Sequence, residues 1–321
     1  MDDSATHLLE QDLAEKYPEV THYTNAVGLH GILNSQTIWA THANFLNDHD
    51  EVELFFNHRL EELCFRAHSE VNNLADESEL RKNSRELAQT IKGRTLEFNE
   101  PFFFSLTSSD SELVKKDGLL SQWRGYGSDG GYALVFKTSD LIDLMREESK
   151  KYGYQYFQIG NVHYFDGLIK NSDTPSAPEV LNAEREVVDC LSGFLRSYRS
   201  ELFGKMYDSI SFLSCMYKSI HFNEEKELRM VAIPAVDPEL FSEGGVKKPI
   251  KTFPRNGCMI PYIELFGPEP DERVKKKLPI KKIIVGPHSG KRIRRKALDI
   301  WLKNLDLNDV EIVVSNISYK G

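Results

Sequence analysis

The feature that most constrains the fold is a set of short strand-like segments separated by helical stretches of very different length. Each segment is rich in β-branched, aromatic and other apolar residues. The segments cover residues 20–25, 37–42, 100–108, 132–137, 154–165, 226–234, 258–266, 281–286 and 310–315. A regular array of parallel strands would alternate evenly with helices. The sequence therefore predicts an α+β fold with a mixed, split sheet.

Two long stretches between these strands are predicted to be helical insertions, at about 48–95 and 178–221. The first carries Leu, Phe and Ala at helical spacing among many charges, which indicates surface helices. Shorter helices are expected at 26–35 and 291–304. No repeat or low-complexity linker divides the chain, so we expect residues 1–321 to form a single domain.

The sequence does not favour a membrane or secreted protein. No apolar run approaches the roughly 18–20 residues that cross a bilayer, and the acidic first residues do not resemble a secretory signal. Cys64, Cys190, Cys215 and Cys258 are scattered and form no CxxC pair, which argues against a disulfide framework or a cysteine zinc site. We expect a cytoplasmic protein with no metal and no membrane partner.

The net charge of −9 is unevenly distributed along the chain. Residues 273–296 contain eleven Lys or Arg and no Asp or Glu. Such a segment on an acidic protein can bind a polyanion such as a nucleic acid. Alternatively, it covers the solvent side of a strand and a helix, and the sequence leaves both interpretations open.

Several familiar site motifs are absent. The sequence has no GxxxxGK[ST], no GxGxxG after a strand, and no HExxH or GxSxG. A P-loop protein, a Rossmann dinucleotide site, a zincin or a hydrolase with a nucleophile elbow would lack its usual mark. Any chemistry must therefore come from a dispersed set of residues.

The first candidates are His22, Tyr23 and Thr24, which end the first predicted strand just before a helix. On a strand, His22 and Thr24 share one face and Tyr23 takes the other. His22 can then donate a hydrogen bond to a ribose hydroxyl, while Thr24 caps the helix that begins at Ala26. The alternative is that His22 is a hydrogen-bonded core histidine and Thr24 is only a cap.

The second candidate is the segment at 121–127, which combines an amide, an indole, a guanidinium and a phenol beside glycines that allow close backbone approach. Trp123, Arg124 and Tyr126 suit a planar, anionic ligand such as a dinucleotide. Alternatively, Trp123 is a core residue and Arg124 pairs with a carboxylate.

The third candidate is the charged run at the start of the strand at 226–234. Period-two geometry places Glu225, Glu227 and Arg229 on one face and Leu228 on the other. Two carboxylates on one strand face cost free energy unless they meet water or a ligand. An exposed edge strand would explain them structurally, and a site would explain them functionally.

In this order the motifs resemble those of a widespread bacterial family of uncharacterised function, some members of which are linked to phage defence or abortive infection. The resemblance rests on HYT before a short helix, LND, FFFSLT, SQWRGYG, ExExR on a strand and IIVGP. HYT with its helix and the late ExE strand also resemble, more remotely, ADP-ribosyltransferases of the DarT type.

The second resemblance implies a split sheet that clamps NAD between a histidine on the first strand and a catalytic glutamate on a late strand. His22 matches the histidine, Glu227 matches the catalytic glutamate, and Glu225 matches the position that engages the acceptor. NAD would be a consumed substrate. The residues expected to bind it are His22, Tyr23, Thr24, Trp123, Arg124, Tyr126 and Arg229.

This resemblance also carries an expectation about geometry. His22, Trp123, Arg124 and Glu227 should line one cleft. Tyr126 and Trp39 both fit the position of the aromatic residue that holds the nicotinamide.

The predicted function is therefore an NAD-dependent ADP-ribosyltransferase, a toxin-like or phage-defence effector that modifies a nucleic acid or a protein. An antitoxin or a defence protein is a candidate partner. Two alternatives stay open. One is an NAD hydrolase with water as acceptor, and the other is a non-catalytic module that binds a nucleotide, a nucleic acid or a protein.

Overall fold

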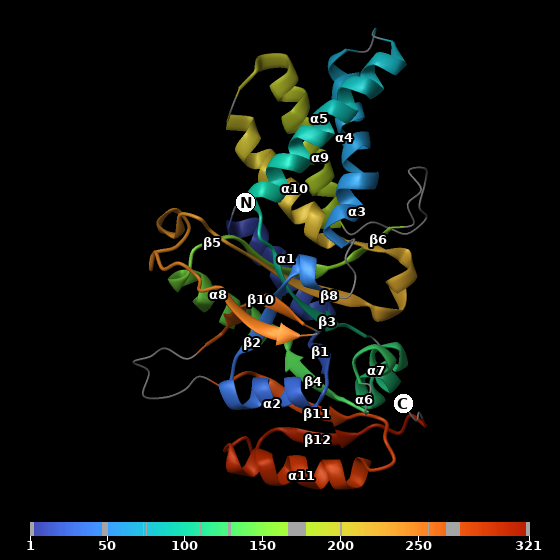
Figure 1. The fold of residues 1–321 in the computed structure, drawn as a ribbon, viewed down its shortest axis with the longest axis vertical. Helices are drawn as coiled ribbons and strands as arrows, with labels where there is room; N and C mark the ends of the chain where they lie inside the picture. The colour runs from blue at the N-terminus through green and yellow to red at the C-terminus, as the bar shows by residue number, and fades with distance from the viewer. Residues whose placement is uncertain are drawn as a thin grey trace.

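A large mixed sheet forms the centre of the protein, and helices cover both of its faces (Figure 1). The computed structural model describes residues 3–46, 51–72, 74, 76–109, 111–127, 130–165, 178–199, 201–255, 257–267 and 277–318. Within these residues the strands of the sheet are β1 (Glu19–Thr24), β2 (Ile38–His42), β3 (Phe102–Thr107), β4 (Tyr132–Lys137), β5 (Tyr154–Asn161), β8 (Glu227–Pro234), β9 (Lys251–Arg255), β10 (Cys258–Leu265), β11 (Ile280–Val285) and β12 (Glu311–Val314).

Strand β3 organises the sheet because it pairs with three other strands. The main path runs β12-β11-β4-β1-β3-β2-β10-β9, and a branch from β3 adds β8 and then β5. Along one edge of β3, β1 pairs Thr21 with Thr107, and β2 pairs Thr41 with Phe103. The other edge is paired with β8 over its whole length. The sheet therefore splits where β1 and β2 part from the same edge of β3.

Five helices form a layer over one face of the sheet at the β3-β8-β5 branch, at the top of Figure 1. This helical layer consists of α3 (Glu51–His58), α4 (Leu60–Val71), α5 (Glu77–Phe98), α9 (Pro178–Ser197) and α10 (Glu201–Met216). Its apolar side chains pack on Phe103, Tyr156, Val231 and Ile233 of the sheet. A short parallel pair, β6 (His163–Phe165) and β7 (Tyr217–Ser219), lies beside the layer.

The opposite face of the sheet carries the largest core. It is packed by α1 (Asp3–Lys16), α2 (Ala26–Ser35), α8 (Thr138–Lys151) and α11 (Lys291–Asn304). The sheet face that carries the helical layer is covered at the other end of the sheet by α6 (Glu112–Asp117) and α7 (Leu120–Tyr126). These two helices lie near β1, β4 and β11. Three 3₁₀ turns complete the described elements: η1 (Ala43–Phe45), η2 (Ile220–Glu225) and η3 (Pro238–Leu240).

The period of two along β3 explains why its sequence is apolar almost throughout. Phe102, Phe104 and Leu106 enter the largest core, whereas Phe103 enters the core under the helical layer. Strand β8 alternates in the same way. Strands buried on both faces read as continuous apolar runs, so the sequence marked both segments as strands.

The structure confirms the mixed α+β class. Helices α3, α4 and α5 lie mostly within the first predicted insertion, and α9 and α10 lie within the second. Three details differ. The strand predicted at 154–165 is two strands, β5 and β6, which belong to different sheets. Between the strands predicted at 226–234 and 258–266 there is a further strand, β9, which pairs with β10. The α-helix in the stretch at 178–221 ends at Met216, and β7 and the start of η2 follow it. All four cysteines are free thiols.

Candidate active site at the β3 junction

The candidate site lies where β1 and β2 separate from β3. The described pairs of β3 with these two strands involve Thr107 at one end and Phe102 and Phe103 at the other, so Ser105 between them has no strand partner on this edge. Instead, the Nδ1 atom of His22 donates a hydrogen bond to the carbonyl oxygen of Ser105 over 3.0 Å. A side chain from β1 thus satisfies a backbone acceptor that the split leaves open.

On its other side Ser105 reaches Glu227, the first residue of β8. The hydroxyl of Ser105 donates to Oε1 of Glu227 over 2.7 Å. Arg229 donates from Nε and Nη2 to the same carboxylate at 2.9 and 3.1 Å, and Lys218 donates from Nζ at 2.7 Å. Glu227 is only 4% exposed. Its carboxylate is therefore held on both oxygens in a buried position.

Lys218 extends this arrangement to a second carboxylate. Its ammonium group also donates to Glu225 over 2.7 Å, and the Glu225 side chain is 18% exposed. We call Ser105, Lys218, Glu225, Glu227 and Arg229 the Glu227 cluster. Its two carboxylates and two cations sum to zero formal charge, which is how a protein can bury four ionised groups together.

The cluster controls the ionisation of Glu227. Burial opposes the charged form, but the charges of Arg229 and Lys218 and their hydrogen bonds outweigh it and lower the pKa of Glu227 to about 2. Glu227 is therefore a carboxylate at neutral pH. Arg229 is 1% exposed. Its guanidinium also donates a hydrogen bond to the carbonyl oxygen of Cys215 and lies over the ring of Phe103. The NAD-binding role predicted for Arg229 is not supported, because its guanidinium is committed to the interior.

His22 is positioned differently from the prediction. Burial lowers its pKa to about 4, against the opposing effect of the bond to Ser105, so the ring is neutral near pH 7. Since Nδ1 carries the proton, Nε2 can only accept a hydrogen bond. No protein atom of the described chain bonds to Nε2. A ribose hydroxyl would thus have to donate to His22, which reverses the direction predicted from the sequence.

His22 and Glu227 also project from opposite faces of the sheet. Thr21, Thr107 and Glu227 form one cross-strand row and share a face. His22 takes the other face, where its ring stacks on Phe104 at 4.3 Å. The expectation that His22 and Glu227 line one cleft is therefore wrong for this structure, and their connection runs through Ser105 alone.

Trp123 and Tyr23 belong to a core and not to a ligand surface. Trp123 is fully buried, its indole N–H donates to the carbonyl oxygen of Asp117 over 3.0 Å, and its ring meets Tyr23 edge-on at 4.9 Å. The Tyr23 hydroxyl accepts from the backbone N–H of Leu119 over 2.7 Å. The stacking role predicted for Trp123 is not supported, and the structural alternative explains both residues.

The remaining predicted residues lie nearer to the surface. Arg124 is exposed, Tyr126 is 39% exposed, and both are on α7, which packs against η2 just before the Glu227 cluster. Thr24 ends β1, but it does not cap α2, because the cap is Asn25, whose side chain accepts from the N–H of Gly28. The prediction for the cap was therefore wrong by one residue.

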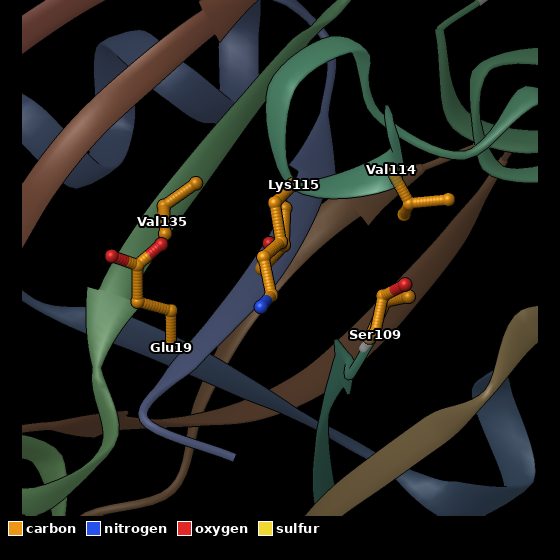
Figure 2. A pocket seen from close by; sticks show the side chains of 7 residues that line it. Glu19, Ser109, Val114, Lys115 and Val135 are labelled. Atoms are coloured by element: carbon orange, nitrogen blue, oxygen red, sulfur yellow. The ribbon is translucent and has the colours of Figure 1, made fainter. Parts of the chain in front are cut away.

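A small pocket lies on the face of the sheet that carries Glu227, although no residue of the Glu227 cluster lines it (Figure 2). Its lining includes Thr21 and Thr107 of the same cross-strand row, and in Figure 2 the side chain of Lys115 lies between those of Glu19 and Ser109. The cavity volume is about 10 Å³, room for about one water molecule. The pocket as it stands therefore does not hold a dinucleotide.

Lys218 and Ser105 are the site residues that the sequence analysis missed. Lys218 stands in a three-residue strand after a long helix, and Ser105 is the one polar residue among the apolar positions of FFFSL. The polar residue within a strand buried on both faces was a usable signal. Within the described residues no group of His, Cys, Asp or Glu is placed to hold a metal ion.

Comparison with known proteins gives one match. Residues 122–230 match the model of a family described as a protein of unknown function (DUF2971). This is an uncharacterised bacterial family. The matched range contains α7 from residue 122 on, Lys218 and the start of β8, but neither His22 nor Ser105. No curated protein and no solved structure matches the chain. Among the helices in the described ranges, none has both the length and the apolar character that a bilayer crossing needs.

Proposed function

We propose that this chain is an NAD-consuming enzyme of the ADP-ribosyltransferase type, with Glu227 as its catalytic carboxylate. The observation that carries the proposal is the link through Ser105, which bonds His22 on the first strand and Glu227 on a late strand. A histidine and a glutamate on these two strands, at the split of a sheet, match the strand positions that the resemblance to ADP-ribosyltransferases implies. The two side chains do not share the one face that clamping NAD between them would require.

The chemistry of the site supports this choice. Breaking the bond between nicotinamide and ribose develops positive charge at the anomeric carbon, and a nearby carboxylate stabilises that charge. Glu227 is ionised at neutral pH because its pKa is lowered to about 2. The fixed partners of Glu227 also hold its oxygens in one orientation, which is the preorganisation that electrostatic catalysis requires.

Glu225 is the proposed contact of the acceptor. It shares Lys218 with Glu227 and is the more exposed of the two carboxylates. The proposed acceptor of the ADP-ribose group is a nucleic acid or a protein. In the alternative NAD hydrolase, the acceptor is water. A role as a toxin-like or phage-defence effector in the cytoplasm, with an antitoxin or defence partner, is part of the same proposal.

One observation favours a second function, a non-catalytic module that binds a nucleotide, a nucleic acid or a protein. The charges of the Glu227 cluster cancel, and both oxygens of Glu227 are already bonded. His22 and Glu227 also lie on opposite faces of the sheet. Because all these charges are paired inside the protein, a structural role is sufficient to explain the ExExR residues. Loss of activity on changing Glu227 separates the two functions.

The test measures nicotinamide release and labelling of DNA, RNA and lysate proteins from labelled NAD. Glu227→Gln keeps the shape and removes the charge, so kcat should fall about 100-fold to 1,000-fold with a smaller change in KM. The control is Glu148→Gln, which breaks a similarly buried bond to Lys248 elsewhere and should leave kcat within a few-fold. Both variants are compared below their melting temperatures.

Further variants and outcomes decide among the alternatives. Glu225→Gln should abolish labelling but keep nicotinamide release in a transferase, whereas a hydrolase should show little selective effect. Full activity of Glu227→Gln would show that the catalytic assignment is wrong. If the wild-type protein neither binds nor consumes NAD with any acceptor, the proposed enzyme is wrong and the non-catalytic module becomes the better interpretation.

A further inference from the structure

Helix α11 presents a group of positive charges that have no partners. Arg292, Arg295 and Lys296 are exposed, and Arg294 beside them is half-buried. Within the described ranges these four side chains make no ion pair and no hydrogen bond. We call Arg292, Arg294, Arg295 and Lys296 the α11 basic face.

Other described basic residues of the segment at 273–296 are engaged with the protein. Lys281 and Lys282 both bond to Glu19, Lys277 donates to the carbonyl oxygen of Asp306, and Lys291 donates to that of Ser315. Arg273 to Lys276 lie outside the described residues. Within the described part of the segment, the basic side chains left for a polyanion are therefore those of the α11 basic face.

The helix geometry gathers these charges on the solvent side. Arg292, Arg295 and Lys296 are spaced i, i+3 and i+4, so they are neighbours on the helix surface. From Arg292 to Lys296 the helix rises by about 6 Å, at about 1.5 Å per residue. Leu298 and Leu302 of the same helix are buried in the largest core. In Figure 1 α11 lies at the outer edge of the molecule, beside β12.

The placement of these charges works against local stability. Like charges at i, i+3 and i+4 repel each other, and basic residues in the first turn of a helix oppose its dipole. The first turn of α11 contains no acidic residue. In a chain of net charge −9, acidic residues that could pair with these groups are plentiful. An unpaired basic face in this position is more easily explained by an external anion.

We propose that the α11 basic face binds the phosphate backbone of a nucleic acid. Phosphate contacts by arginine and lysine provide affinity without reading sequence, which suits a face that offers several cations and few neutral hydrogen-bonding groups. This inference goes beyond NAD consumption and does not depend on it.

An anionic membrane surface is the other polyanion that such a helix can meet. A helix that binds lipid needs a free apolar side that enters the bilayer. The continuous apolar side of α11 is already buried in the protein, although Ile293 and Ile300 remain exposed on its flanks. The observations therefore favour nucleic acid, and lipid vesicles become an arm of the test.

The experiment uses the full chain without NAD, so that its result is independent of catalysis. Binding of labelled double-stranded and single-stranded DNA and RNA is followed by fluorescence anisotropy at several salt concentrations. Three phosphate contacts on duplex DNA should weaken wild-type binding about 40-fold between about 50 and 200 mM salt, from a slope of about 0.9 per contact. The combined variant Arg292→Gln, Arg295→Gln and Lys296→Gln should lose this dependence and the corresponding affinity.

The matched control removes the same charge from another helix. Arg81, Arg85 and Lys92 of α5 are each paired with a carboxylate, and their change to Gln should leave binding nearly unaltered. Equal losses in both triple variants would reduce the effect to net charge and overturn the proposal. An absence of DNA and RNA binding at low salt would also overturn the proposal. The same holds if the α11 triple variant still binds DNA but, unlike the α5 variant, no longer binds phosphatidylserine vesicles.

Discussion

At the scale of single residues, His22 gives the protein a defined response to acid. Its pKa falls from 6.5 to about 4 because burial disfavours the charged ring, while the bond to Ser105 opposes the shift. The unfolded chain therefore binds this proton first as the pH falls. The stabilising contribution is complete above about pH 6.5 and is lost as the pH falls toward about 4.

This predicts that wild type loses about 2 kcal/mol of unfolding free energy between pH 6.5 and pH 5 through His22, at about 1.4 kcal/mol per pH unit. Urea denaturation at pH 7 and pH 5 measures the loss. His22→Gln should remove this part of the pH dependence, and the exposed His221→Gln should keep it. An unchanged pH dependence in His22→Gln would mean that another group is responsible.

Local sequence was a good guide to the candidate site only where one strand supplied the residues. The period of two placed Glu227 and Arg229 on one face of β8, but Glu225 lies in η2 before the strand and joins them only through Lys218. Lys218 reaches the same carboxylates from another element, and Ser105 does so through the register of β3 against β8. Neither contact leaves a signal in local sequence, because each depends on how separate strands are aligned.

At the scale of elements, α7 is a structural helix whose key residue is Trp123. The ring is fully buried against β1 and β4. Trp123→Ala should therefore lower the unfolding free energy by about 3–5 kcal/mol, the usual cost of removing a large buried aromatic side chain. Chemical denaturation measures this loss.

A ligand-stacking Trp123 would behave differently, with weaker NAD binding and little change in stability. The control is Leu113→Ala on α6, since Leu113 is 73% exposed and its loss should cost less than about 0.5 kcal/mol. A Trp123→Ala protein as stable as this control would restore the ligand role.

Two of the quoted motifs have a structural explanation at this scale. A Cβ atom on Gly286 of IIVGP would lie 1.6 Å from the carbonyl oxygen of Gly130, which precedes the strand GYALVF. Gly130 itself has φ of +90°, a conformation that favours glycine. The close approach of these two glycines, at one end of the antiparallel pair of β4 and β11, is a tertiary contact.

At the scale of the whole molecule, the two cores share their central strands. Phe102 and Phe104 fill one core and Phe103 fills the other. Neither core can open without disturbing β3. We therefore expect the sheet and the helical layer to unfold in one transition.

Tryptophan fluorescence and circular dichroism test this expectation, because all three tryptophans (Trp39, Trp123 and Trp301) lie outside the helical layer. Leu63→Ala in the middle of that layer should cost about 2–5 kcal/mol. Both signals should move to the same lower denaturant midpoint. A fluorescence midpoint that stays in place while the helical signal moves would show that the layer unfolds alone.

The sequence was sufficient for the α+β class because strands and helices leave periodic signals. It was not sufficient for the branch at β3, since a strand with three partners reads no differently from a strand with two. The assembly of the helical layer also depends on contacts such as the bond from Arg59 to Glu184, two residues that are 125 positions apart.

The pairing of β3 has a consequence for synthesis on the ribosome. The edge of β3 that pairs with β8 is complete once residue 107 has been made, but β8 begins only at residue 227. At about 5–20 residues per second, the nascent chain needs on the order of 6–24 s to supply that partner. During this interval an apolar strand, FFFSLT, has an open edge of the kind that other chains can join. Production of the protein should therefore depend on translation speed and on chaperones that shield nascent strands.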